Sequence, residues 1–288
     1  MLNKQLIIGT AQSDDTYGFN KKKNFEGLIL HIKKKKYLLD TAPNYKNSNF
    51  FFNKLGKNYS KIISKLPKIS ETKNFKLMLS KKINEIFYKC NSEKIYGILL
   101  HDPKVIFNRK KREILIEEIN NLKKMGKIKK FGVSVYSVKE TKKILSYLVP
   151  DIIQCPINIF NQTFTKDSFL QSLKKKNIEI HARSVFLQGL LLLDKKNVPN
   201  YFLKKPKVKN YFNFLEKEKL LALRFNLIYL SSLRYVDKFV VGFDNLRQLK
   251  DFLKLKKNEK FYKYKKTFFK KFEIKNIDLI DPRKWKTK

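Results

Sequence analysis

The sequence predicts a single-domain (β/α)8 barrel, in which eight parallel strands close into a ring that helices surround. Short apolar runs alternate with amphipathic segments along a chain of 288 residues. Barrels of this kind occupy about 250 residues in one domain, so the length fits one core. A doubly wound sheet is the alternative, but the sequence lacks the Gly-x-Gly-x-x-Gly fingerprint of that fold.

The first half of the chain contains four strand-helix units. Each expected strand is a short apolar run bounded by polar or turn-forming residues, and each expected helix repeats its apolar residues every three or four positions. The expected strands are residues 5–10, 37–41, 61–66 and 95–100. The expected helices are residues 24–35, 48–55, about 71–90 and 114–124. Gly56 and Gly126 are expected to terminate the second and fourth helices.

The second half continues the alternation. The expected strands are residues 129–135, 152–156, 178–184 and 239–241. The expected helices are residues 138–148, 165–176, 219–231 and 246–255. The stretch 190–210 carries Pro199 and Pro206 and is predicted to be an irregular loop. We expect the barrel to span residues 1–255 and residues 256–288 to form a basic extension packed on its outside or bottom.

Composition excludes several classes of protein. Hydrophobic residues make up 42% of the chain, which is enough for a sizeable core. No apolar run approaches the roughly 20 residues of a membrane span, and the N-terminus has no signal-peptide pattern, so we expect a cytoplasmic protein without a membrane partner. Cys90 and Cys155 lack metal-ligand spacing, which indicates structural thiols in a reducing compartment.

The net charge of +40 raises a second functional hypothesis. Lys and Arg number 65 against 25 acidic residues, and a charge of this size attracts polyanions. The lysines are scattered over nearly every expected helix, whereas binding would require clustering on one face. We therefore expect no specific nucleic-acid partner and treat an anionic-polymer binding protein as an alternative.

Polar side chains stand where the second, third and fourth expected strands end. Asp40 and Tyr45 follow the second strand, Lys65 lies near the end of the third, and His101 follows the fourth. Because the carboxyl ends of barrel strands share one face, these residues are expected to meet in one pocket. Each residue alone has a structural interpretation as a turn former, rim aromatic, surface lysine or strand-end histidine.

Five ordered motifs resemble those of the aldo-keto reductases. They are Gly-Thr-Ala-Gln at 9–12, Asp-Thr-Ala-Pro-Asn-Tyr at 40–45, Ile-Ser-Lys at 63–65, Leu-Leu-His-Asp-Pro at 99–103, and residues 126–134. The similarity extends from residue 6 to about 255, and the first motif with Tyr17-Gly18 resembles bacterial members associated with sugar metabolism. The resemblance implies a barrel enzyme that reduces a small aldehyde or ketone, including sugar-derived ones, with NADP or NAD. It leaves the oligomeric state open.

The chemistry of carbonyl reduction requires residues of these types. Hydride transfer leaves an alkoxide to be protonated, and a phenol is a reluctant acid unless a neighbouring cation stabilises its anion. By resemblance, Tyr45 is the acid, Lys65 is that cation, and Asp40 keeps Lys65 charged. His101 would donate a hydrogen bond to the carbonyl oxygen. A catalytically silent, nicotinamide-binding regulatory barrel is the alternative, although it would not need all four residues.

The resemblance also implies the cofactor site. Ser134, Gln154 and Asn158 correspond to the positions that bind the nicotinamide carboxamide, a group that both donates and accepts hydrogen bonds. Alternatively, Ser134 is a turn former and Gln154 bonds a buried backbone group. The remaining implied cofactor positions are Thr10, Arg183, Ser184, Gly189, Gly242, Asn245, Arg247 and Gln248.

The sequence departs from the family pattern at several of these positions. Lys46 and Asn49 replace a Gly and a Glu that many relatives have after the catalytic Tyr, and Arg183 replaces a Tyr that commonly stacks under the nicotinamide. Asp244 would repel a 2′-phosphate whereas Arg247 would attract one, so NADP is expected from family habit alone and NAD is the alternative. The substrate itself is expected to depend on loops 14–23, 104–112 and 190–210.

Overall fold

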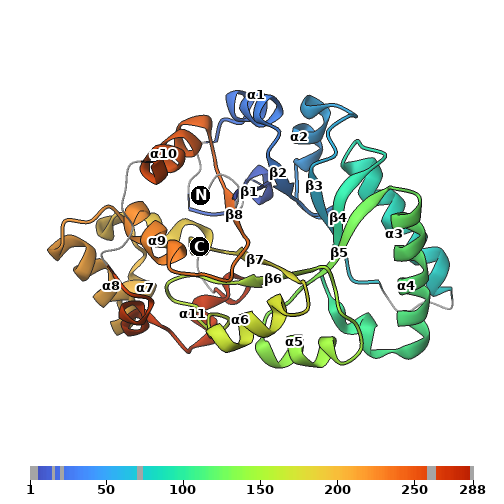
Figure 1. The fold of residues 1–288 in the computed structure, drawn as a ribbon. Helices are drawn as coiled ribbons and strands as arrows, with labels where there is room; N and C mark the ends of the chain where they lie inside the picture. Colours follow the sequence, from blue (N-terminus) through green and yellow to red (C-terminus); the bar gives the residue numbers. More distant parts are fainter. Residues whose placement is uncertain (1–5, 15–16, 20–22, 70–73, 258–263, 286–288) are drawn as a thin grey trace.

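Eight parallel strands close into one barrel in sequence order, and helices surround it (Figure 1), which confirms the predicted fold class. The computed structural model describes residues 6–14, 17–19, 23–69, 74–257 and 264–285. The first and last strands pair directly, from Leu6 opposite Phe239 to Gly9 opposite Gly242, so the sheet has no free edge. None of the helices in these ranges is long and apolar enough to cross a membrane.

The strands agree with the predicted ranges to within one or two residues. They are β1 (Leu6–Gly9), β2 (Leu38–Asp40), β3 (Ile62–Leu66), β4 (Ile95–Leu100), β5 (Ile128–Ser134), β6 (Ile152–Pro156), β7 (Glu179–Arg183) and β8 (Lys238–Gly242). The helices are α1 (Glu26–Lys35), α2 (Ser48–Leu55), α3 (Phe75–Lys89), α4 (Arg109–Lys124), α5 (Val138–Leu145), α6 (Asp167–Lys174), α7 (Asn200–Leu203), α8 (Pro206–Lys217), α9 (Ala222–Ser231), α10 (Leu246–Lys257) and α11 (Ile277–Ile280). Residues 5 and 71–73, where the first strand and third helix were expected to begin, lie outside the described ranges.

The predictions of one loop and of one helix start were wrong. The expected loop 190–210 contains α7 and the start of α8, because Pro206 occupies the first turn of α8, where a missing backbone N–H costs no hydrogen bond. Helix α4 begins at Arg109, five residues before the expected 114, because the Asn108 side chain caps it by accepting a hydrogen bond from the Lys111 N–H (3.0 Å).

Side-chain alternation along the strands builds the barrel interior in layers. Ile7, Ile63, Leu99 and Ile152 form an apolar middle layer, each buried from solvent. Because side chains alternate between the two faces of a strand, the residue two positions after Ile63 also points inward. That residue is Lys65, at the carboxyl end of β3. The alternation therefore places polar side chains directly above the apolar layer, at the carboxyl ends of the strands.

Gly132 in β5 allows this interior to close. A Cβ at this position would lie 2.5 Å from Leu99 Cδ2 and 2.6 Å from the Ile152 carbonyl oxygen. Contacts this short require the backbone of a neighbouring strand to move, which packed interiors resist. Gly132 is therefore a packing requirement of the barrel.

The described part of the C-terminal segment, residues 264–285, packs against α8 and α9. Phe269 and Phe272 are buried, and their rings lie 5.4 and 5.7 Å from the ring of Phe225 in α9. Further along, the Trp285 ring lies 4.8 Å from the ring of Phe202. These contacts carry the end of the segment to the carboxyl-end face of the barrel, where Arg283 lines a pocket.

Candidate active site

A pocket of about 640 Å³ opens at the carboxyl ends of the strands and brings four predicted residues together. Asp40, Tyr45, Lys65 and His101 all line it, and they come from β2, the loop after β2, β3 and the loop after β4. In (β/α)8 barrels this face carries the chemistry, since loops from several strands converge there.

Lys65 and Asp40 form a buried ion pair in the floor of the pocket. Lys65 Nζ lies 2.5 Å from Asp40 Oδ1, and the two side chains are only 3% and 6% exposed. Lys65 Nζ also donates to the Thr41 carbonyl oxygen (3.1 Å), and Gln154 Nε2 donates to Asp40 Oδ2 (2.8 Å). Burial alone would lower the pKa of Lys65, but the Asp40 carboxylate outweighs that effect and raises it. Lys65 is therefore a fixed positive charge.

Tyr45 lies on the turn that follows β2. Its backbone N–H donates to the Ala42 carbonyl oxygen (3.0 Å), and Lys65 Nζ lies 5.4 Å from the centroid of its ring. A second phenol, Tyr17, lines the same pocket, and its burial raises its pKa well above the ordinary value. Of these two phenols, Tyr45 is the one beside the buried ammonium group.

His101 presents a neutral imidazole to the pocket. Its backbone N–H donates to the Leu66 carbonyl oxygen (2.9 Å), which holds the residue in line with β3. Burial and the positive charge of Lys65 lower the pKa of His101 to about 4. At neutral pH one ring nitrogen therefore carries a proton and the other does not, so His101 can donate a single hydrogen bond without carrying a charge.

Several buried polar atoms of the pocket have no hydrogen-bond partner within the described ranges. They are Gln12 Oε1, Ser134 Oγ, Gln154 Oε1 and Gln188 Oε1. Buried polar groups are nearly always satisfied, so unpaired atoms that line a cavity indicate a polar ligand. Ser134 and Gln154 were expected to bind a nicotinamide carboxamide, and their free hydroxyl and carbonyl oxygens fit an amide, which both donates and accepts.

The loop after β7 contributes Ser184 and Gly189 to the lining, as expected for cofactor positions. Its backbone is unusual, because Ser184 (φ 56°), Leu187 (φ 49°) and Gln188 (φ 55°) all adopt left-handed conformations. Non-glycine residues rarely adopt this conformation, and those that do are concentrated at active sites and ligand-binding loops, where the surrounding structure holds them in place. Gly189 (φ 96°) meets the same requirement without strain.

Sequence reasoning missed an aromatic and charged cluster at the mouth. The Tyr136 ring lies between two guanidinium groups, with Arg183 Cζ 4.2 Å and Arg283 Cζ 3.6 Å from its centroid. Asp281 accepts from Arg283 through both carboxylate oxygens (2.5 and 2.9 Å). Arg183, which was expected to replace a stacking Tyr, therefore lines the pocket and is itself stacked on the Tyr136 ring. No local sequence signal links Tyr136 to Arg283. Gln12, which also lines the pocket and was not predicted as a site residue, could have been found because it belongs to the first family motif.

The structure does not bring four other predicted cofactor residues into the pocket lining. Thr10 is buried and donates to Thr41 Oγ1 (2.8 Å). The side chain of Asn158 bonds the backbone of its own turn and the Ser184 carbonyl oxygen (3.0 Å). Asn245 accepts from the backbone N–H of Gln248 at the start of α10 (3.0 Å).

The fourth of these residues, Arg247, points into solvent. Its side chain is 92% exposed, and its Nε lies 3.9 Å from Asp251 Oδ2. Gly242 and Gln248 do line the pocket in this region, together with Asp244 and Asp251. Any side chain at position 242 would overlap Gln12, 1.8 Å away, so Gly242 leaves the room that Gln12 occupies. Nowhere in the described ranges do three or more His, Cys, Asp or Glu residues gather as a metal site would require.

Solved structures of similar architecture support this assignment of the fold. An aldo-keto reductase from Bacillus halodurans, in its holo form, is 16% identical with a TM-score of 0.69, over 93% of this chain and 91% of that one. The glycerol dehydrogenase of Gluconobacter oxydans is 18% identical with a TM-score of 0.64, over 96% and 92% of the two chains. No curated protein sequence matches the chain.

Membership of a family is shown by the sequence itself. The model of the aldo/keto reductase family matches residues 5–273, which is most of the chain, and includes the four residues of the pocket floor and its rim. Members of this family are NAD(P)-dependent oxidoreductases. The chain therefore belongs to the aldo/keto reductase family.

Proposed function

We propose that the chain reduces a small aldehyde or ketone to an alcohol with NADH or NADPH, and that Tyr45 is the general acid. The observation that carries the proposal is the buried Lys65–Asp40 pair beneath the Tyr45 ring. A purely structural role for Lys65 would not require a buried, charged ammonium group next to a phenol. A catalyst requires that charge, because it stabilises the phenolate left after proton transfer.

The proposed roles follow from position and charge. Tyr45 donates the phenolic proton to the oxygen of the reduced carbonyl, and Lys65 stabilises the resulting anion. Asp40 keeps Lys65 protonated, and Gln154 holds the second oxygen of that carboxylate (2.8 Å). His101, neutral at physiological pH, donates a hydrogen bond that orients the carbonyl group.

The lining fits a nicotinamide ring. When bound, the reduced nicotinamide supplies the hydride. The Ser134 hydroxyl and the free oxygen of Gln154 would bond its carboxamide, which satisfies two buried atoms that otherwise have no partner within the described ranges. Arg183, with its guanidinium on the Tyr136 ring, would lie against the nicotinamide where relatives have an aromatic residue.

The proposed cofactor preference rests on the start of α10. The family generally uses NADP, but Asp244 and Asp251 line the pocket at this point, and the Arg247 side chain is 92% exposed and lies 3.9 Å from Asp251. Two carboxylates disfavour a 2′-phosphate, whereas they can accept hydrogen bonds from a ribose 2′-hydroxyl. We therefore expect NADH to serve at least as well as NADPH.

Small hydroxylated carbonyl compounds are the proposed substrates. The mouth combines apolar side chains, such as Phe19 and Leu192, with hydrogen-bonding groups on Tyr17 and Arg283. Phe19 and Leu192 come from two of the loops expected to set specificity, although residues 15–16 and 20–22 of the first loop lie outside the described ranges. The Gluconobacter oxydans relative is a glycerol dehydrogenase, which supports a substrate of this size and polarity.

A cofactor-oxidation assay tests the proposal. The purified chain would be mixed with NADH or NADPH and a panel of glyceraldehyde, aldoses, keto-sugars and simple aldehydes, and nicotinamide absorbance would be followed. We expect turnover with at least one short hydroxylated aldehyde. Quenching of protein fluorescence by the cofactor, without oxidation across the panel, would instead support the silent-binder alternative.

A further inference from the structure

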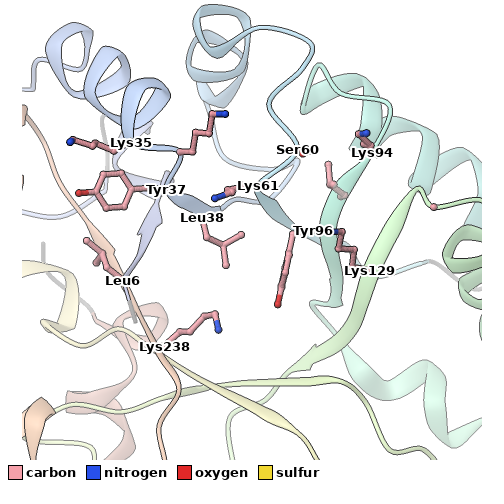
Figure 2. A pocket seen from close by; sticks show the side chains of 13 residues that line it. Leu6, Lys35, Tyr37, Leu38, Ser60, Lys61, Lys94, Tyr96, Lys129 and Lys238 are labelled. Carbon is pink, nitrogen blue, oxygen red and sulfur yellow. The ribbon is translucent and has the colours of Figure 1, made fainter. Parts of the chain in front are cut away.

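A second cavity, of about 740 Å³, lies at the opposite end of the barrel from the candidate active site. Its lining includes Leu6, Leu38 and Ile95, which stand at the amino ends of β1, β2 and β4. Figure 2 shows side chains from these strands and from the loops that precede them arranged around the hollow. We call this cavity the lysine basin, since the lysines that line it are Lys35, Lys36, Lys61, Lys94, Lys129 and Lys238.

The barrel topology gathers these lysines from distant parts of the sequence. Lys35 is the last residue of α1 and Lys36 follows it. Lys61 and Lys94 lie just before β3 and β4 (Figure 2). In a (β/α)8 barrel every helix returns the chain to the same end, so loops that precede the strands all meet there. Lysines that are scattered along the sequence therefore share one face.

Of the six lysines that line the basin, only Lys238 lies near an acid within the described part of the chain. Glu179 is the acid beneath the floor, and its carboxylate already accepts from Tyr96 Oη (3.0 Å) and lies near Lys130 Nζ (3.4 Å) and Lys238 Nζ (3.5 Å). Burial alone would raise the pKa of Glu179, but the hydrogen bond from His181 and the charge of Lys238 outweigh it, so Glu179 stays ionised. Among the described residues, no carboxylate lines the basin itself.

The other five lysines of the basin have no ion pair within the described part of the chain. One structural explanation for lysines here is compensation of helix dipoles, because helices end at this face. Helix α1 ends at Lys35 and α4 ends just before Gly126, which lines the basin. Each helix end carries about half a negative charge, so two ends offset roughly one of the six positive charges. Glu179 offsets the charge of Lys238, and most of the positive charge of the basin remains.

The concave shape of the basin strengthens its attraction for anions. A concave surface with walls of low dielectric focuses the field of its charges, and the basin lies within the roughly 300–1,000 Å³ of small-ligand sites. Its ammonium groups are compact charges that can each contact a phosphate oxygen without the planar geometry that arginine requires. Tyr37 and Tyr96 add ring surface to the walls (Figure 2).

We propose that the lysine basin binds a compact multivalent anion made of linked phosphates. A ligand of this class carries several charges over a few ångströms, so it can contact more of the lysines at once than a single phosphate or carboxylate can. Two sources share the chemistry: a free oligophosphate and the phosphate chain of a nucleoside triphosphate. The second would also place its base against the ring of Tyr37 or Tyr96, which would add stacking energy.

The test is calorimetric titration of the full chain with tripolyphosphate at about 0.15 M salt, where scattered surface charges are largely screened. One variant replaces three basin lysines (Lys61→Gln, Lys94→Gln, Lys129→Gln). A matched variant removes the same charge from exposed lysines on α3, α4 and α5 (Lys81→Gln, Lys110→Gln, Lys142→Gln). We expect the basin variant to bind about tenfold more weakly or worse, and the matched variant to bind within about twofold of the native chain.

Two results would overturn the proposal. Equal weakening in both triple variants would mean that net charge, and not the basin, attracts the ligand; absence of binding by the native chain would remove the site altogether. Melting temperatures of both variants check their folding, and the single changes Lys94→Gln and Lys129→Gln provide the comparison if the triple variant unfolds. A parallel titration with ATP identifies the source, since tighter binding than tripolyphosphate, lost in the basin variant, indicates a nucleotide.

Discussion

Breaking the Lys65–Asp40 pair should destabilise the fold much more than breaking a surface pair. The two side chains are 3% and 6% exposed, so either one left alone is a buried charge without its counter-ion. Removal of one partner from such a pair costs about 3–5 kcal/mol, whereas removal of both leaves no uncompensated charge. We therefore expect Asp40→Asn and Lys65→Met each to lower the free energy of unfolding by this amount. The double variant should be about as stable as either single variant.

Urea unfolding of the four proteins, followed by circular dichroism, gives the coupling free energy between the two side chains. The expected coupling is about 3–5 kcal/mol, because the double variant should be destabilised by only as much as one single variant. The chain offers a matched control in Arg109 and Glu113, whose Nε–Oε1 distance is 2.9 Å but whose side chains are 83% and 60% exposed.

For the control cycle, with Arg109→Met and Glu113→Gln, the expected coupling is about 0.3–0.5 kcal/mol. A buried-pair coupling no larger than that of the surface pair would refute the reasoning. It would mean that Lys65 is not held as a charged group by Asp40, and the electrostatic basis of the proposed acid would fail with it.

Three further predictions concern packing, pH and cofactor. Gly132→Ala should lower the free energy of unfolding by about 1–3 kcal/mol in urea, because its methyl group overlaps a neighbouring strand. Glu179→Gln should cost about 1–3 kcal/mol at neutral pH. Because the folded-state pKa of Glu179 is depressed, its contribution is full above about pH 4 and is lost as pH falls, so the variant and native curves should converge in acid. Asp251→Asn should release Arg247 and raise kcat/KM for NADPH relative to NADH by about threefold or more; an unchanged ratio would contradict the proposed role of the carboxylate.

The barrel and the pocket floor were predictable because their signals are local. Asp40, Lys65 and His101 each stand at the end of an apolar run, and parallel strands bring such ends to one face. The two-residue period of a strand also fixes which side chains face inward, as Ile63 and Lys65 show. These inferences require no knowledge of distant contacts.

The mouth of the pocket was not predictable in the same way. The contact between Tyr136 and Arg283 joins the loop after β5 to the C-terminal segment, and no pattern in either stretch points to the other. Resemblance placed Arg247 at the cofactor, but the direction of an exposed side chain depends on local partners, and Asp251 lies one helical turn away. Such details are set by tertiary packing and local charge.

The distribution of lysine shows how topology changes the meaning of a sequence pattern. Positions 35, 61, 94 and 129 appear scattered along the chain, so the sequence alone does not indicate that lysines gather on one face. Each position, however, lies close to the start of a strand, and the fold brings the starts of all strands to one end of the barrel. Residues spaced at the length of one strand-helix unit therefore form a cluster that charge counting along the chain does not detect.

The central claim is that Tyr45 protonates the reduced carbonyl, and the single change Tyr45→Phe tests it most directly. The change removes one oxygen and keeps the ring, so the cofactor should bind with unchanged affinity. Carbonyl reduction should fall by about 10²- to 10⁴-fold, the usual contribution of a positioned acid. Tyr88→Phe, at a tyrosine that is 83% exposed on α3, provides the matched control and should retain the native rate. If Tyr45→Phe reduces the best substrate as fast as Tyr88→Phe does, another group supplies the proton and the assignment of Tyr45 is wrong.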